Sequence, residues 1–65
     1  MPEYRNSDMR RCIDEYVRNS RYKEVLRLRF CEGRTYEEIS GIASYSPQHV
    51  KHICKTYRDM LISHL

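Results

Sequence analysis

Apolar residues recur along this chain at the three- and four-residue spacing that places side chains on one face of an α-helix. The spacing predicts helices over residues 8–18, 21–31, 36–43 and 47–64. No period-2 pattern typical of strands and no internal repeat is visible. We therefore predict an all-α fold, a single four-helix domain spanning residues 1–65.

The apolar positions of the four segments define the expected core. Ser7 or Asp8 is expected to cap the first helix and Asn19–Ser20 the second, while Gly33 ends the second. Gly41, within the third helix, costs about 1 kcal/mol relative to alanine, and a close approach by another backbone would account for it. The expected core residues are Met9, Cys12, Ile13, Tyr16, Val17, Tyr22, Val25, Leu26, Leu28, Phe30, Ile39, Ile42, Ala43, Val50, Ile53, Cys54, Tyr57 and Leu61.

Two helix starts can be recognised by residues that are typical N-caps. Thr35 followed three residues later by Glu38 is a capping box, in which each side chain accepts from the backbone N–H of the other residue. Ser46–Pro47 offers a hydroxyl at the cap and a proline at the first helical position. A short helix, a break at residues 43–45 and a longer helix form the outline of a helix-turn-helix, so nucleic-acid binding is the leading hypothesis.

The longer helix has two distinct faces at about 100° per residue. One face is apolar, and the other carries Gln48, Lys51, His52, Lys55 and Asp59. In a major groove, glutamine pairs with adenine, and lysine or histidine donates to guanine. Lys55 is expected to meet phosphate, as are Thr35 and the free N–H groups of the third helix. Arg27, Arg29 and Arg34 are expected to neutralise the DNA backbone. The alternative is an ordinary solvated face.

Composition narrows the class of protein. The chain is 40% hydrophobic and 32% charged, which is globular rather than disordered. A net charge of +3 permits binding to a polyanion without requiring it. No apolar run approaches the roughly 20 residues of a membrane span, and no signal-peptide segment is evident, so we expect a cytoplasmic protein.

The sequence offers little support for a metal, a cofactor or an enzyme. Cys12, Cys31 and Cys54 form no C-x-x-C pair, and reduced thiols are expected. His49 and His52 have metal-ligand spacing but no third ligand nearby. Sixty-five residues leave little room for a substrate pocket. We expect neither a cofactor nor a metal, and no enzymatic activity.

Three segments together resemble region 4 of bacterial sigma factors: EVLRLRF (Glu24–Phe30), TYEEIS (Thr35–Ser40) and SPQHVKHI (Ser46–Ile53). The resemblance covers residues 20–61, and Met9–Val17 matches the preceding helix of that domain. It implies a helix-turn-helix that binds the promoter −35 element and a surface that touches RNA polymerase. The chain is also similar to the output domains of LuxR-type response regulators, which share EVL, a glycine, an EI pair and S-x-x-V-K.

The resemblance assigns Pro47, Gln48, Lys51 and His52 to the groove, and Ile39, Val50 and Ile53 to helix packing. Pro47 stands where sigma factors commonly have arginine, Gln48 where they have glutamate, His52 where they have glutamine, and Ser44 where they have the turn glycine. These departures weaken the expectation of a standard −35 target. With no region 2, the chain resembles a small stand-alone regulator of bacterial or phage type. The candidate DNA-binding residues are Thr35, Pro47, Gln48, His49, Lys51, His52 and Lys55.

Two functions remain open at the level of sequence. The first is a sequence-specific DNA-binding transcription regulator acting on double-stranded DNA. The second is a protein-interaction module that docks on RNA polymerase or a sigma factor with little DNA contact. Apolar residues around the end of the last helix, residues 60–65, also suggest a homodimer, with a frayed terminus as the alternative.

Overall fold

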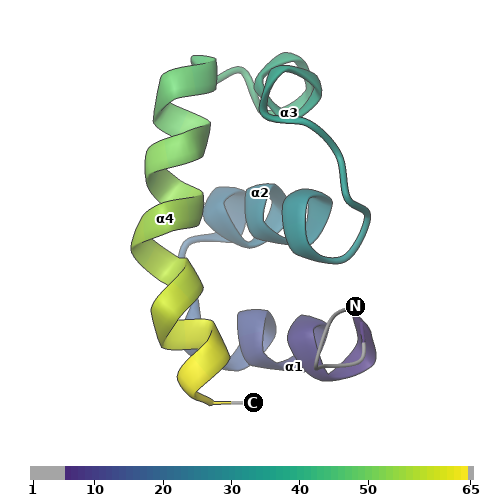
Figure 1. Cartoon of the computed structure of the whole chain (residues 1–65), viewed down its shortest axis with the longest axis vertical. Helices are drawn as coiled ribbons and strands as arrows, with labels where there is room; N and C mark the ends of the chain where they lie inside the picture. Colours follow the sequence, from purple (N-terminus) through teal and green to yellow (C-terminus); the bar gives the residue numbers. More distant parts are fainter. Residues whose placement is uncertain (1–5, 65) are drawn as a thin grey trace.

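The computed structural model describes residues 6–64, and Leu65, one of the residues expected at a dimer contact, lies outside them. The predicted all-α fold of four helices is confirmed, and the described residues include no strand. Helix α4 runs along one side of the domain and contacts the other three helices (Figure 1). None of the described helices has the length and apolarity needed to cross a membrane. The helices are α1 (Asn6–Tyr16), α2 (Ser20–Phe30), α3 (Tyr36–Ala43) and α4 (Pro47–Ser63).

The first helix begins earlier than its apolar stripe indicated. It starts at Asn6, so Ser7 and Asp8 lie within the helix and neither is its cap. The amide of Asn6 donates to the carbonyl of Cys31 at 3.1 Å, which ties this exposed first turn to the end of α2. Residues 6–8 are polar and exposed, so the hydrophobic pattern alone does not reveal this part of the helix.

The other helix boundaries follow local capping chemistry. Asn19 caps α2 because its side chain accepts from the N–H groups of Arg21 and Tyr22, so Ser20 is helical. Gly33 adopts a φ of 70° after α2, a conformation that glycine reaches without steric cost. Ser44 is left-handed, with a φ of 60°, although it carries a side chain. This left-handed conformation ends α3, and the Ser44 N–H makes the last bond of the helix, to the Ser40 carbonyl.

Residues of all four helices form the core, with α2 and α4 each packed against both α1 and α3, and most of the predicted core residues are buried. Two predictions were wrong: Tyr16 is 42% exposed and Ile42 is 49% exposed. Tyr16 stacks instead on His64 at the surface, with ring centroids 3.9 Å apart. Ile42 lies at the flank of the buried side of the short helix α3, which carries Ile39 and Ala43. The buried residues are Met9, Cys12, Ile13, Val17, Val25, Leu26, Leu28, Ile39, Ala43, Val50, Ile53, Cys54 and Leu61.

Gly41 is not explained by packing within the chain. A Cβ atom at this position would meet nothing within 4 Å, so the expected close approach of a second backbone is absent among the described residues. The glycine therefore lowers the stability of α3 relative to alanine, and no contact with the described part of the chain compensates for this cost.

The three cysteines are free thiols. Burial raises the pKa of Cys54, and burial also raises that of Cys31 although Arg10 and Arg27 oppose it. A raised pKa lowers the thiolate fraction at neutral pH, and thiolate is the reactive form. Cys54 thus serves as a small apolar residue of the core, in which Cys12 is also buried.

Candidate nucleic-acid interface

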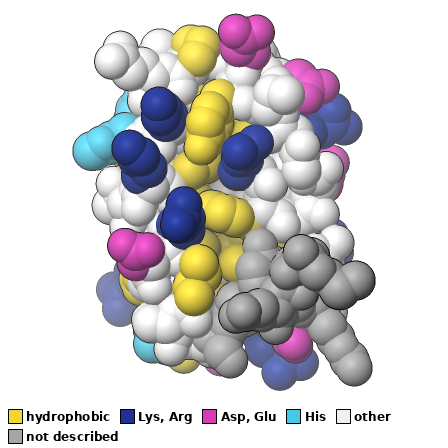
Figure 2. Space-filling view, in the orientation of Figure 1, with side chains coloured by type: hydrophobic (Ala, Val, Ile, Leu, Met, Phe, Trp, Pro, Cys, Tyr) yellow, Lys and Arg dark blue, Asp and Glu magenta, His cyan; other side chains and the backbone are white. Residues whose placement is uncertain are grey.

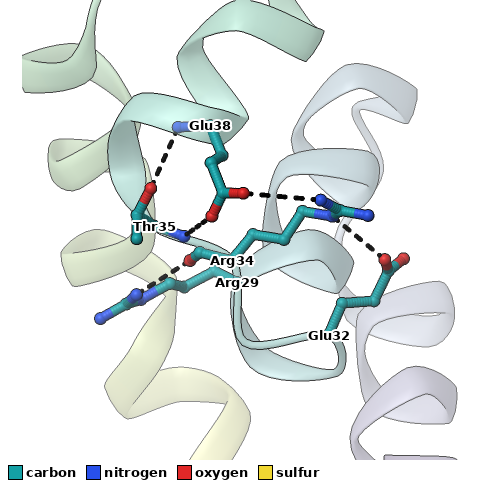
Figure 3. Close-up of polar contacts among 5 residues, drawn as sticks. All are labelled: Arg29, Glu32, Arg34, Thr35 and Glu38. Carbon is teal, nitrogen blue, oxygen red and sulfur yellow. Dashed lines mark hydrogen bonds and ion pairs between the residues drawn. The ribbon is translucent and has the colours of Figure 1, made fainter.

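The start of α3 is built by the predicted capping box, which the structure contains in full (Figure 3). The N–H of Glu38 donates to the Thr35 hydroxyl oxygen at 3.2 Å, and the N–H of Thr35 donates to the Glu38 carboxylate at 3.0 Å. Arg34 lies 3.7 Å from the same carboxylate and 3.3 Å from that of Glu32. These reciprocal bonds fix where α3 begins.

The capping box uses two of the backbone N–H groups at the start of α3, so fewer donors remain for an anion. The Glu38 carboxylate already fills the cap, so a phosphate would meet the N–H groups of Tyr36 and Glu37, which have no intrahelical partner. The Thr35 hydroxyl accepts from Glu38 but retains its own proton to donate. Thr35 is therefore positioned to contact phosphate as a hydroxyl donor.

Replacing Thr35 by alanine should destabilise the domain by about 1 kcal/mol, because the N–H of Glu38 loses its partner. In a domain of this size the melting temperature should fall by roughly 4–8 °C. Thr56→Ala is the matched control, since Thr56 is an exposed residue inside α4 whose hydroxyl only returns to the His52 carbonyl. Equal melts for the parent and Thr35→Ala would contradict the capping role.

The same cap predicts a pH dependence. The pKa of Glu38 lies below its ordinary value of 4.5, first because the Thr35 backbone N–H donates to the carboxylate. A depressed folded-state pKa stabilises the domain above the unfolded pKa, and this stabilisation is lost as the pH falls through the folded value. The difference in melting temperature between the parent and Glu38→Gln should therefore become smaller as the pH is lowered from 7 to 3. Glu15→Gln, at an exposed position of α1, controls for net charge, and a constant difference would contradict the prediction.

A shallow depression joins the starts of α3 and α4. Its α3 side is lined by Thr35, Tyr36 and Glu37, and its α4 side by the residues Pro47, Gln48 and Lys51. Four of the seven predicted site residues are thus brought together, although Thr35 and Pro47 are twelve positions apart in the sequence. Ser46 caps α4 by accepting from the His49 N–H at 3.2 Å, with Pro47 at the first helical position as predicted.

The exposed side of α4 carries the basic side chains of this helix. Gln48, Lys51, His52 and Lys55 are all exposed. Arg58, which sequence reasoning did not single out, continues the spacing of Lys51 and Lys55 at i, i+4 and i+7, and it lines a second depression with Lys55. Figure 2 shows Lys and Arg side chains gathered along α4 beside a strip of hydrophobic side chains. The spacing was visible in the sequence and would have identified Arg58.

The three arginines expected to neutralise phosphate differ in their surroundings. Arg27 lies 4.0 Å from the Asp14 carboxylate, and Arg34 is paired with two glutamates. Arg29 instead lies over the Tyr36 ring at 4.4 Å and donates to the Arg34 carbonyl at 2.9 Å. The Arg29 guanidinium is thus held at the start of α3 while most of its donors remain available.

His49 lies apart from the other predicted site residues of α4. It is half-buried, with its ring 4.6 Å from that of Tyr45 and 6.4 Å from that of Tyr22. Its ring is therefore engaged on the α2 side of α4, and its DNA contact stays a prediction. Within residues 6–64, no group of three metal-ligating side chains includes His49 or His52.

Comparison with known families agrees with this geometry. The family model for sigma-70, region 4 matches residues 19–56, which span α2, α3 and most of α4. Neither the curated proteins nor the solved structures gave a match. The predicted closeness to LuxR-type output domains is not supported by these comparisons. The matched segment covers more than half of the chain, and the chain therefore belongs to the sigma-70 region 4 family of DNA-binding helix-turn-helix domains.

Proposed function

We propose that this domain is a sequence-specific transcription regulator that inserts the first turns of α4 into the major groove of double-stranded DNA. The observation that carries the proposal is the exposed set Gln48, Lys51 and His52, on a helix whose start lies beside the start of α3. Gln48 can pair with an adenine, and Lys51 and His52 can donate to guanine. Both helices stand on a single core, so base contacts and phosphate contacts are made together.

The phosphate contacts assigned in this proposal lie on both sides of the reading residues. Thr35 and Arg29 contact one backbone at the start of α3, while Lys55 and Arg58 extend the contact along α4. Glu37 lines the same depression, and its carboxylate would repel a phosphate beside it. In this proposal the phosphate therefore lies on the Thr35 and Arg29 side of the helix start, and a base edge faces the Glu37 carboxylate. Carboxylates accept from the amino group of cytosine, which makes Glu37 a further reader in this proposal.

The test is selection of bound sites from a random duplex library, followed by titration of the selected duplex at two salt concentrations. Each phosphate contact should contribute about 0.9 to the slope of log affinity against log salt. Enrichment of one site together with a steep slope supports the proposal. Failure to bind any duplex at low salt would refute it and favour docking on RNA polymerase or a sigma factor.

We further propose that two copies act together, because a single small module buries only about 600–1,000 Å² on DNA. Ile62, near the end of α4, is 48% exposed and supports a contact at this position. Leu61 beside it is fully buried, so truncating the helix end would disturb the core.

Ile62→Ser should therefore shift the protein toward monomer at tens of micromolar while leaving the melt nearly unchanged. Analytical ultracentrifugation measures this shift. Ile42→Ser, at an isoleucine of similar exposure on α3, is the matched control. A monomeric parent at this concentration would refute the dimer.

A further inference from the structure

The turn between α3 and α4 is held by a side chain from the start of α2. The Arg21 guanidinium donates to the Ala43 carbonyl at 2.6 Å and lies over the Tyr45 ring at 4.6 Å. Ala43 is the last residue of α3, and Tyr45 comes two residues before α4 begins. Arg21 therefore fastens the end of one helix of the helix-turn-helix to the approach of the next.

The Tyr45 ring carries this restraint into the first turn of α4. It lies 4.6 Å from the His49 ring at an interplanar angle of 61°, an edge-to-face arrangement. Tyr22 stands edge-on to both rings, at 6.2 Å from Tyr45 and 6.4 Å from His49. The Ser40 hydroxyl also donates to the Tyr45 carbonyl. The turn residue is thus fixed through both its ring and its backbone.

His49 is the third residue of α4, directly after Gln48 and one turn before Ile53. Because consecutive helical residues are rotated by about 100°, fixing the side on which His49 lies fixes the direction in which its neighbours point. Reading a base edge requires a side chain held to within about 0.5 Å and 10–20°. The aromatic contacts of His49 restrain the first turn of α4, which carries Gln48 and leads directly to Lys51 and His52.

We propose that Tyr45 is a positioning residue for base recognition, that Arg21 holds its ring, and that His49 transmits the restraint to the rotation of α4. The inference rests on the proposed base-reading role of α4. It assigns to His49 a contact with the protein rather than with DNA. Within residues 6–64, the contacts of Tyr45 run through its ring and its backbone carbonyl, so its hydroxyl is not needed for this role.

The rival explanation is that Tyr45 or Arg21 itself contacts DNA. A direct phosphate contact adds affinity for every duplex, whereas a positioning residue affects mainly the preference for the selected site. A simple loss of folded protein lowers both affinities by the same factor. The ratio of affinities for the selected duplex and for a scrambled duplex of equal length therefore separates positioning from both alternatives.

The experiment compares Tyr45→Ala, Tyr45→Phe and Arg21→Lys with the parent at one salt concentration. Tyr16→Ala is the matched control, because it also removes a tyrosine that stacks on a histidine of the α4 segment, but near the opposite end of α4. Tyr45→Ala should reduce the affinity ratio by roughly tenfold, the scale of the aromatic contacts removed. Arg21→Lys keeps the charge but loses the planar stack, so it should also reduce the ratio. Tyr45→Phe and Tyr16→Ala should keep the parent ratio.

An unchanged ratio in Tyr45→Ala and Arg21→Lys would overturn the inference while the parent still selects its site. A reduced ratio in Tyr45→Phe would assign the effect to the hydroxyl and overturn it as well. If Tyr45→Ala does not fold, the affinity ratio of Arg21→Lys decides whether the inference holds, because Arg21 is exposed and its substitution should leave the fold intact. A parent that prefers no duplex would refute the proposed function instead, so the two failures are distinguishable.

Discussion

Ile39→Ala is expected to lower the free energy of unfolding by about 2–5 kcal/mol, through lost burial and the cavity left behind. Ile39 is fully buried on the inner side of α3, which packs against both α2 and α4. At about 0.05–0.15 kcal/mol per residue, a domain of 65 residues has only about 3–10 kcal/mol of stability. The substitution should therefore unfold a large fraction of the protein or lower its melting temperature by more than about 10 °C.

Ile42→Ala is the control for this prediction because it makes the same chemical change three residues along the same helix. Ile42 is 49% exposed, so little burial is lost, and alanine is the better helix former. Its melting temperature should match or slightly exceed that of the parent. Circular dichroism melts of the two variants provide the measurement. Equal losses in both would contradict the buried position of Ile39.

The helix starts of the helix-turn-helix could be predicted from sequence because capping is local. Thr35 and Glu38 meet across three residues, and Ser46 meets the N–H of His49 across the same distance. Such contacts need no tertiary structure, and the predicted bounds of α3 agree with the structure. The first turn of α1 could not be found in this way, because its observed tie is between Asn6 and the distant Cys31.

The exposure of individual apolar residues was harder to predict. The spacing of Tyr16 and Ile42 matches that of buried neighbours, but each is exposed near the end of its helix. Where that happens depends on how the helices cross and where they end, which an apolar stripe does not encode. Gly41 illustrates the same limit, since the sequence suggested a close backbone contact that residues 6–64 do not contain.

The candidate site was predicted in part for similar reasons. Gln48, Lys51, His52 and Lys55 share one exposed side of α4, and helical periodicity alone places them there. The surroundings of His49 depend on Tyr22 and Tyr45, which approach from other segments of the chain. A histidine on the flank of a helical wheel gives no sign of such partners. The contacts of His49 with these two rings therefore emerge only in the folded domain.

Lys51→Ala and His52→Ala are each expected to weaken binding to the selected duplex by about 1–3 kcal/mol and to relax the preference at one base position. The physical reason is that, in the proposed function, each side chain donates to a base edge whose acceptors other bases lack. Both residues are exposed, so the melting temperature should change little. Competition binding against duplexes carrying every single base change measures the preference at each position.

Lys55→Ala provides the contrast because it removes the same side chain one turn further along the same exposed side of α4. A phosphate contact carries no base information, so this variant should weaken selected and scrambled duplexes about equally. It should also reduce the salt slope by about 1. If Lys51→Ala behaved in the same way, Lys51 would be a phosphate contact and base reading would fall to Gln48 and His52. If Lys51→Ala and His52→Ala both kept the parent's base preferences, the assignment of α4 as the recognition helix would be wrong.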